Sequence, residues 1–131
     1  NFGICGEFGD VGHKGKIETP ITFESLVKTV EEKLNTKVVC LNFGKNEIST
    51  IGVVSGGAAS YLEYANNNPV DVFITGEPLH YVYHYAKELK INVIYAGNYK
   101  NETVGIIALM NKIKEQFPDL NTQFIDLPTG F

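Results

Sequence analysis

The segment DVFITGEPLHYVYHYAKELKINVIYAG, residues 71–97, decides the fold. It predicts a buried strand at 71–75, a helix at 79–89 and a second buried strand at 91–96. Both strands are short, apolar and rich in β-branched residues, while the stretch between them has the length and spacing of a helix. A strand, a helix and a strand in this order form a right-handed crossover, which makes the two strands parallel.

The alternation continues on either side of this segment. TIGVVSGG predicts a strand at 50–55, and AASYLEYA predicts a helix at 57–66. A further helix is predicted at 101–116, and TQFIDLP closes the chain as a strand at 122–128. Short strands alternating with helices favour a parallel sheet with helices on both faces. We therefore predict a layered α/β/α domain with a mainly parallel sheet.

The N-terminal third is less regular. FGICGEF predicts a strand at 2–8, followed by a polar loop at 9–19. Apolar residues at helical spacing predict a helix at 22–34 with Thr22 as its N-cap. KVVCLNF predicts a strand at 37–43. These strands either lengthen the sheet or form an antiparallel edge.

Composition narrows the classes of partner. The chain has 131 residues and a net charge of −4, and it contains no dense run of Lys and Arg, so nucleic acid is not an expected partner. No apolar stretch approaches the roughly 20 residues that a membrane span needs. With 44% apolar residues, the chain is long enough for one compact domain over residues 1–131.

Two features concern the cell compartment and the start of the chain. Cys5 and Cys40 fall in predicted strands, and we expect both to be small buried residues of a cytoplasmic protein; a disulfide or a redox role is the alternative. The chain starts at Asn1, directly before a predicted strand. We expect a further segment to precede it in the native protein.

Three glycine-containing loops follow the predicted parallel strands, at 55–57, 75–77 and 97–102. Ligands of open α/β sheets bind beyond the carboxyl ends of the strands. The first loop either offers backbone N–H groups to an anion or is only a tight turn. Glu77 either caps a helix, binds a cation or acts as a base. Glu102 would lie in the first turn of a helix, where the dipole favours a carboxylate by roughly 0.3–1 kcal/mol.

The histidines give weaker signals. His80 and His84 are four residues apart on the predicted helix and share a face, so they could bind a transition metal with a nearby carboxylate. Tyrosines crowd the same helix, however, and the spacing matches no zinc motif. A partly buried or interface pair is the favoured interpretation. His13 stands alone in the polar loop and receives no role.

At these loops the chain resembles the Nif-three-like family, which includes the type 2 homologues of GTP cyclohydrolase 1. FGICGEF resembles the family's Gly-Ile-Gly-Glu strand, and LNFGKNEISTIGVVSGGAAS resembles its central strand and glycine turn. Residues 71–109 follow the family's run of strand, TGE, helix, strand, AGHYxTE and helix. FIDLPTGF resembles its C-terminal strand and tail.

The resemblance implies that the chain is the C-terminal part of a longer protein with two related α/β halves. Family members form ring-shaped hexamers and hold two divalent metal ions between the halves. The implied ligands are an N-terminal His pair, an acidic residue that would precede Asn1, and the His and Glu of AGHYxTE. In this chain Glu102 is kept, whereas Asn98 replaces the His. A neutral amide oxygen suits hard cations and is a poor ligand for Zn or Fe, so we expect weakened transition-metal binding.

Two functions follow from the resemblance. The first is a metal-dependent hydrolase, a GTP cyclohydrolase 1 type 2 homologue acting on a nucleotide or another phosphorylated small molecule, in which two metal ions activate water and neutralise phosphate charge. The alternative is a non-catalytic oligomeric scaffold with a degraded metal site. In both cases the expected partner is the protein itself, and no catalytic residue is assigned.

Overall fold

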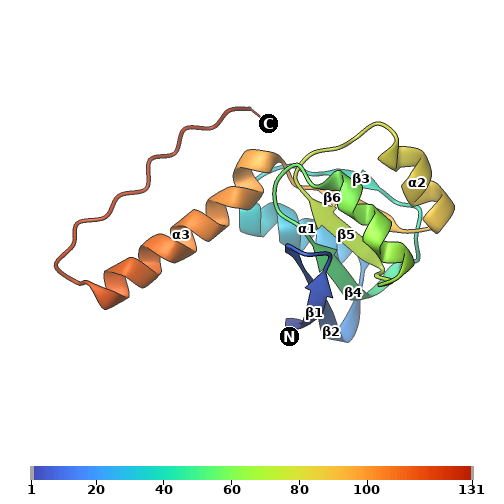
Figure 1. Ribbon diagram of the computed structural model, residues 1–131, viewed down its shortest axis with the longest axis horizontal. Coiled ribbons are helices and arrows are strands. Elements are labelled where there is room, and N and C mark those ends of the chain that lie inside the picture. The colour runs from blue at the N-terminus through green and yellow to red at the C-terminus, as the bar shows by residue number, and fades with distance from the viewer. Residues whose placement is uncertain (1, 131) are drawn as a thin grey trace.

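The computed structural model describes residues 2–130 and forms a six-stranded sheet in the order β1-β2-β4-β5-β6-β3 (Figure 1). The strands are β1 (Phe2–Phe8), β2 (Gly12–Thr22), β3 (Val39–Leu41), β4 (Glu47–Val53), β5 (Val72–Thr75) and β6 (Asn92–Tyr95). The helices are α1 (Phe23–Leu34), the 3-10 helix η1 (Ala59–Asn66), α2 (Val82–Leu89) and α3 (Asn98–Gln116). Across the described residues, none of these helices has the length and apolar character to cross a membrane.

The centre of the sheet is parallel, as predicted. β5 pairs in parallel with β4 on one side and with β6 on the other. The flanks are antiparallel: β2 pairs with β4, β1 with β2, and β3 with β6. The predicted α/β/α class is confirmed, and the N-terminal strands supply an antiparallel edge.

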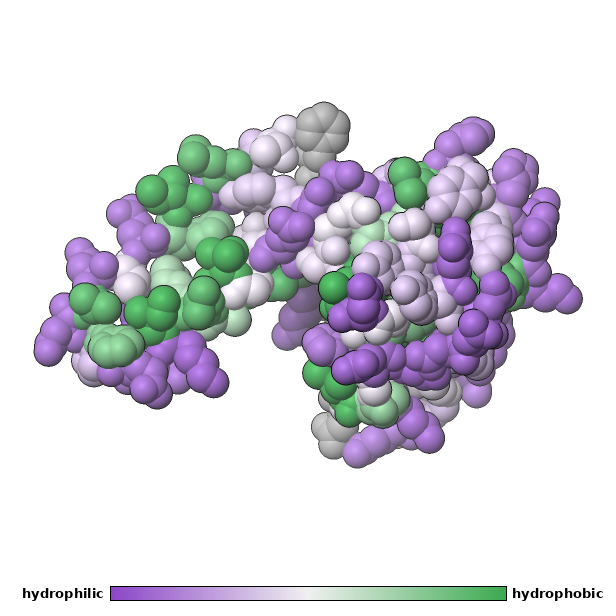
Figure 2. All heavy atoms as spheres, in the orientation of Figure 1, coloured by the Kyte–Doolittle hydropathy of each residue, from purple (hydrophilic) through white to green (hydrophobic). Residues whose placement is uncertain are grey.

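The chain divides into a sheet body, residues 2–97, and an arm, residues 98–130. In Figure 1 α3 leaves the body and the remaining chain runs back along it. No residue of α3 is buried. Figure 2 shows hydrophobic residues gathered on the arm. The large apolar side chains exposed there are Val104, Ile106, Leu109, Phe117, Leu120, Ile125 and Leu127.

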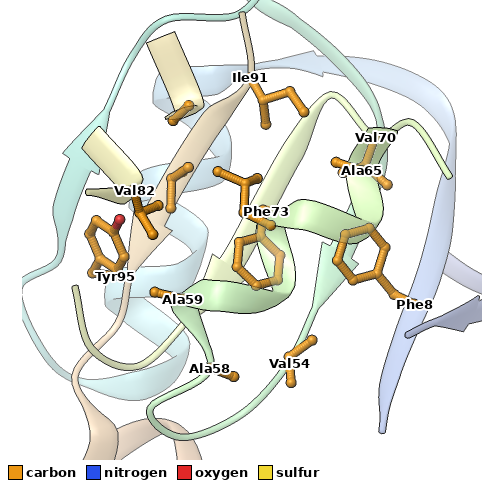
Figure 3. Packing of buried hydrophobic residues seen from close by; sticks show 13 residues of the cluster. Phe8, Val54, Ala58, Ala59, Ala65, Val70, Phe73, Val82, Ile91 and Tyr95 are labelled. Atoms are coloured by element: carbon orange, nitrogen blue, oxygen red, sulfur yellow. The ribbon is translucent and has the colours of Figure 1, made fainter. Parts of the chain in front are cut away.

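Apolar clusters fill both faces of the sheet body, which explains the three layers. Successive residues of a strand point to opposite faces, so Val72 packs on the side of α1 while Phe73 packs on the side of η1 and α2. The Phe73 ring stacks on Phe8 with a centroid distance of 5.4 Å (Figure 3). The first helix begins as predicted, because the Thr22 hydroxyl accepts a hydrogen bond from the Ser25 N–H at 3.2 Å.

The predicted loop at 9–19 is wrong, because most of it belongs to β2. Two of the buried positions of β2 are the glycines Gly12 and Gly15. A Cβ on Gly12 would lie 2.4 Å from the Phe8 carbonyl oxygen, so the position requires glycine. Alternating apolar residues, the usual signal of a strand, are therefore absent here. His13 lies on this strand and is exposed.

Two other expectations also fail. Cys5 and Cys40 are exposed free thiols rather than buried residues. They lie on β1 and β3, the outermost strands of the sheet, where less of the molecule covers each side chain. The predicted strand at 122–128 has no regular structure. A strand requires a hydrogen-bonded neighbour, and these residues run along a helix instead.

The starts of the other three helices differ from the predictions by two or three residues. The helix predicted at 57–66 is a 3-10 helix that starts at Ala59. The helix predicted at 79 starts at Val82, so His80 precedes it. The helix predicted at 101 starts at Asn98, so its first turn holds no acidic residue and Glu102 lies further along it. The helix dipole therefore does not account for Glu102.

Candidate metal site at the glycine loops

The loops after β4, β5 and β6 are joined to one another through their backbones. The Gly76 N–H donates to the Gly56 carbonyl oxygen at 2.8 Å, and the Gly97 N–H donates to the Gly76 carbonyl oxygen at 3.1 Å. The Thr75 hydroxyl also donates to the Gly56 carbonyl oxygen at 3.1 Å. The three loops predicted from the sequence to lie at one edge of the sheet therefore form one continuous surface.

Glycine permits this close approach. A Cβ on Gly76 would lie 2.6 Å from the Gly56 carbonyl oxygen and 3.0 Å from the Asn98 Cα. Gly56 has φ +76°, a left-handed conformation that side chains disfavour. Residues 55–57 thus form a tight turn. The absence of a side chain at Gly56 also lets the start of α3 lie against this turn.

Asn101 ties α3 to the glycine turn. Its Oδ1 accepts hydrogen bonds from the Ser55 hydroxyl at 2.8 Å and from the Gly56 N–H at 3.1 Å. The Gly56 N–H is therefore satisfied by a protein oxygen, which argues against its use for an anion. Asn101 was missed at the sequence level, because nothing in its surroundings distinguishes it from other polar residues near a helix start.

Glu77, Asn98 and Glu102 converge above Gly56 and Gly57. Asn98 Nδ2 donates a hydrogen bond to Glu77 Oε1 at 2.7 Å. Glu102 Oε1 and Asn98 Oδ1 lie 2.6 and 3.6 Å from the position that a Cβ would take on Gly56. Glu77 Oε2 lies 3.2 Å from the corresponding position on Gly57. Side chains from the loop after β5 and from α3 thus place three oxygen-bearing groups around one small space.

Neither glutamate caps a helix. The N-cap residues of α2 and α3 are Tyr81 and Gly97, and neither helix start has a side-chain cap hydrogen bond. This removes the helix-cap explanation for Glu77 and Glu102. Asn98 Oδ1 is buried and has no hydrogen-bond partner among the described residues. A buried amide oxygen without a donor is costly, by about 1–3 kcal/mol, so this oxygen needs a partner from outside the described chain.

The donor set fits a hard divalent cation. Carboxylate and amide oxygens are the ligands that Mg²⁺, Mn²⁺ and Ca²⁺ prefer, whereas a site for Zn²⁺ usually contains His or Cys. Within residues 3–130 no group of three or more His, Cys, Asp or Glu side chains is arranged to hold a metal ion. The chain therefore offers an oxygen-only partial shell, in which Glu102 and Asn98 are the residues that would hold the ion.

A cavity of about 450 Å³ adjoins this space, a size typical of small-molecule sites. Glu102 and Asn101 form part of its wall, and α1 forms another part, including Lys33. The remaining walls are mostly apolar and come from Val30, Leu34, Val53, Ile74 and Val104. No sequence signal connects α1 with the start of α3, so this cavity could not be predicted.

The histidine pair lies away from the glycine loops. His80 and His84 are both exposed, so the pair is not partly buried, and the alternative of an interface pair stays a prediction. They line a groove between α2 and β3 together with Val39, Leu41, Pro78, Leu79, Tyr83 and Tyr95. The ring of His84 lies edge-on to Tyr83 at 5.3 Å. Glu77, the nearest acidic residue before them in the sequence, is engaged by Asn98.

Comparison with known proteins identifies similar sequences. The family model for Duf34/NIF3 (NGG1p interacting factor 3) matches residues 7–129. A Pyrococcus horikoshii protein named GTP cyclohydrolase 1 type 2 homolog is 40% identical over 121 residues, which cover 92% of this chain and 48% of that protein. An Archaeoglobus fulgidus protein of the same name is 36% identical over 129 residues, covering 95% and 50%. The chain spans about half the length of these curated relatives.

Solved structures share the fold. The protein ybgI superposes with a TM-score of 0.90 at 29% identity, over 98% of this chain and 52% of that chain. TTHA1606 from Thermus thermophilus superposes with a TM-score of 0.79 at 31% identity, over 87% of this chain and 45% of that chain. The fold described above therefore recurs as a part of longer proteins.

Proposed function

The chain belongs to the Duf34/NIF3 family, and on this premise we propose that the protein is a divalent-metal-dependent hydrolase acting on a nucleotide or another phosphorylated small molecule. In this proposal Glu102 and Asn98 are metal ligands, with Asn98 in the place of the family histidine. The observation that carries it is the buried Asn98 Oδ1, which has no donor in the described chain and lies close to the Glu102 carboxylate above Gly56.

The metal ion and the cavity would have different roles in hydrolysis. A bound divalent cation supplies Lewis acidity toward water and phosphate oxygens. The protein contributes a fixed set of oxygens at the glycine loops, and the adjoining cavity keeps the apolar part of a substrate out of water. A nucleotide has a flat base and an anionic phosphate. The apolar walls match the base, and Glu102, one of the proposed metal ligands, lines the same cavity.

The test of this proposal is Asn98→His. Imidazole is a better ligand than a neutral amide for Zn²⁺, and the start of α3 already directs position 98 toward Glu102. Because changes around a metal typically alter affinity by roughly 10–100-fold, we expect a gain on the order of 10-fold or more. Titration calorimetry and metal analysis at one pH measure it. Asn121→His, on the exposed tail, is the control. Equal affinity and stoichiometry in both variants would exclude position 98 from the site.

The second candidate is a non-catalytic oligomeric scaffold, and the arm is the observation that favours it. α3 buries none of its residues, and the arm exposes seven large apolar side chains. A patch of this kind is typical of a surface that another protein covers. Under either candidate we propose that the protein self-assembles, with the ring-shaped hexamer of the family resemblance as the expected form, in the cytoplasm. The free thiols Cys5 and Cys40 are consistent with a reducing compartment.

Light scattering combined with metal analysis separates the two candidates. Self-assembly with a tightly held metal favours the hydrolase, whereas self-assembly without metal favours the scaffold. Leu109→Lys on α3 places a charge on the apolar surface of the arm and is expected to reduce the assembly, while Leu79→Lys, an exposed leucine of the body, leaves it unchanged. A full-length protein that stays monomeric at high concentration contradicts self-assembly, whereas a monomeric fragment does not.

A further inference from the structure

The hydrogen bond between Glu77 and Asn98 joins the loop after β5 to the start of α3. The bond is 2.7 Å long, which is short for an N–H donor and typical of a charged acceptor. An ionised carboxylate accepts hydrogen bonds but cannot donate one. The Asn98 amide must therefore present its N–H group to Glu77, whichever way the side chain would otherwise turn.

The orientation of the other amide atom follows from this bond. With Nδ2 facing Glu77, Oδ1 faces the opposite direction, toward the space above Gly56 where Glu102 Oε1 lies. Oδ1 is buried there without a donor in residues 2–130. If the amide rotated by half a turn, the oxygen would meet the Glu77 carboxylate and repel it. Glu77 thus excludes the orientation that would direct an N–H group, which cannot bind a cation, toward Glu102.

We propose that Glu77 is a positioning residue for the metal site, which fixes the Asn98 amide so that its oxygen and the Glu102 carboxylate face the same ion. This inference rests on the proposed function, because it concerns the same site. It assigns a role to a residue that has none in either candidate function. It also states the chemistry of the ion, a hard dication, since the residue that occupies the histidine position offers oxygen alone.

A ligating side chain commonly needs a partner of this kind. Carboxylates that hydrogen-bond the far side of a metal ligand orient it, and their loss typically costs roughly 10–100-fold in metal affinity. Glu77 has this relation to Asn98, and it comes from the loop after β5, whereas Glu102 lies on α3. The first consequence is that Glu77→Gln weakens binding without removing a ligand, because a glutamine amide no longer dictates which end of Asn98 faces it.

The second consequence is that a second substitution restores metal affinity. A hydrogen bond that only stabilised the fold would not give this result. In the double variant Glu77→Gln with Asn98→Asp, the glutamine N–H donates to the aspartate, and the second aspartate oxygen faces Glu102. The direction of the hydrogen bond is reversed, but the number of carboxylates equals that of the unchanged protein. An oxygen again points at the ion, so the double variant is expected to recover the affinity.

The experiment is Mn²⁺ titration followed by electron paramagnetic resonance, which measures the free ion directly. We expect Glu77→Gln to weaken Mn²⁺ binding on the order of 10-fold or more. Glu77→Asp, which keeps the charge but is too short to reach Asn98, should weaken it similarly. The double variant should restore binding, and Glu88→Gln on the exposed side of α2 should leave it unchanged. Thermal unfolding in a chelator checks that each variant is folded.

Each other outcome overturns a distinct claim. If Glu77→Gln binds Mn²⁺ normally while Glu102→Gln does not, the role of Glu77 is wrong and the metal site stands. If the double variant stays as weak as Glu77→Gln, Glu77 acts on the ion directly and the positioning role is wrong. If the unchanged full-length protein binds no Mn²⁺, both the positioning role and the proposed metal site are wrong.

Discussion

The sheet body and the arm use apolar residues in opposite ways. The body buries its apolar side chains in two clusters, one on each face of the sheet. The arm carries apolar side chains along α3 and the following tail, yet none of the residues of α3 is buried. The body therefore has the core that stabilises a domain, whereas α3 contributes no buried residue to any core. The candidate metal site lies at their junction, where Asn98 and Asn101 tie the first part of the arm to the body.

The largest contrast is expected between two phenylalanines. Phe73 is fully buried and stacks on Phe8, whereas Phe117 on the arm is 58% exposed. Phe73→Ala leaves a cavity in the core and should lower the free energy of unfolding by about 3–5 kcal/mol. Phe117→Ala should change it by about 0.5 kcal/mol or less. Denaturant unfolding of both variants measures the difference. Equal losses would mean that the arm packs on the body as tightly as the core does.

A smaller contrast is expected for the half-buried carboxylate of Asp71. Asp71 Oδ2 accepts hydrogen bonds from the Ser49 and Thr50 N–H groups at 2.8 Å, and Oδ1 lies 3.0 Å from Lys45 Nζ. Burial by itself raises the pKa of this carboxyl, but these donors outweigh burial and hold the pKa below its usual value. A hydrogen bond to a charged group contributes about 1.5–3 kcal/mol. Because Asp71 is partly exposed, Asp71→Asn should lower the free energy of unfolding at neutral pH by no more than that amount.

The lowered pKa of Asp71 predicts how the stability loss in Asp71→Asn depends on pH. Because the folded protein binds the proton less readily than the unfolded chain, the carboxylate stabilises the fold fully above its unfolded pKa of about 4. That contribution is lost as the pH falls through the lowered pKa of the folded state. The difference in unfolding free energy between the protein and Asp71→Asn should therefore shrink below about pH 4. Asp119→Asn, on the exposed arm, should show no such trend.

The parts predicted from the sequence are those that depend on local pattern. The three parallel strands, the capped helix α1 and the order of the layers follow from apolar spacing and the Thr22 cap. The convergence of the loops holding Gly56, Glu77 and Asn98 follows from the same topology, since parallel strands end at one edge. The metal role of Asn98 and Glu102 remains a prediction.

The parts that could not be predicted depend on contacts between distant residues. The buried glycines of β2 hide its strand pattern, because only the proximity of Phe8, Val53 and Val54 explains Gly12. Cys5 and Cys40 look like core residues until the strand order places them on the outermost strands. Residues 122–128 have the composition of a strand but lack a neighbouring strand within the described chain. The link between Glu77 and Asn98 spans 21 residues, and no local pattern predicts it.

The smallest expected effect concerns the contact that holds the tail against α3. The Tyr99 hydroxyl donates to Asp126 Oδ1 at 2.7 Å and accepts from the Leu127 N–H at 2.7 Å. The Asp126 carboxylate raises the pKa of the Tyr99 phenol, so the phenol keeps its proton at neutral pH. Tyr99→Phe removes both hydrogen bonds but keeps the ring.

Because these groups are exposed, Tyr99→Phe should barely change the free energy of unfolding. Local opening should nevertheless increase, since stability is not uniform along a chain and this contact is one of few that hold the tail. Amide hydrogen exchange should become faster in residues 117–130 and stay the same in β5 and β6. Tyr81→Phe, an exposed tyrosine of the body, is the control. Unchanged exchange in the tail would mean that its apolar side chains, and not the tyrosine, hold it on α3. In that case the arm would have a small apolar core of its own. It would then differ from the sheet body only in the size of that core.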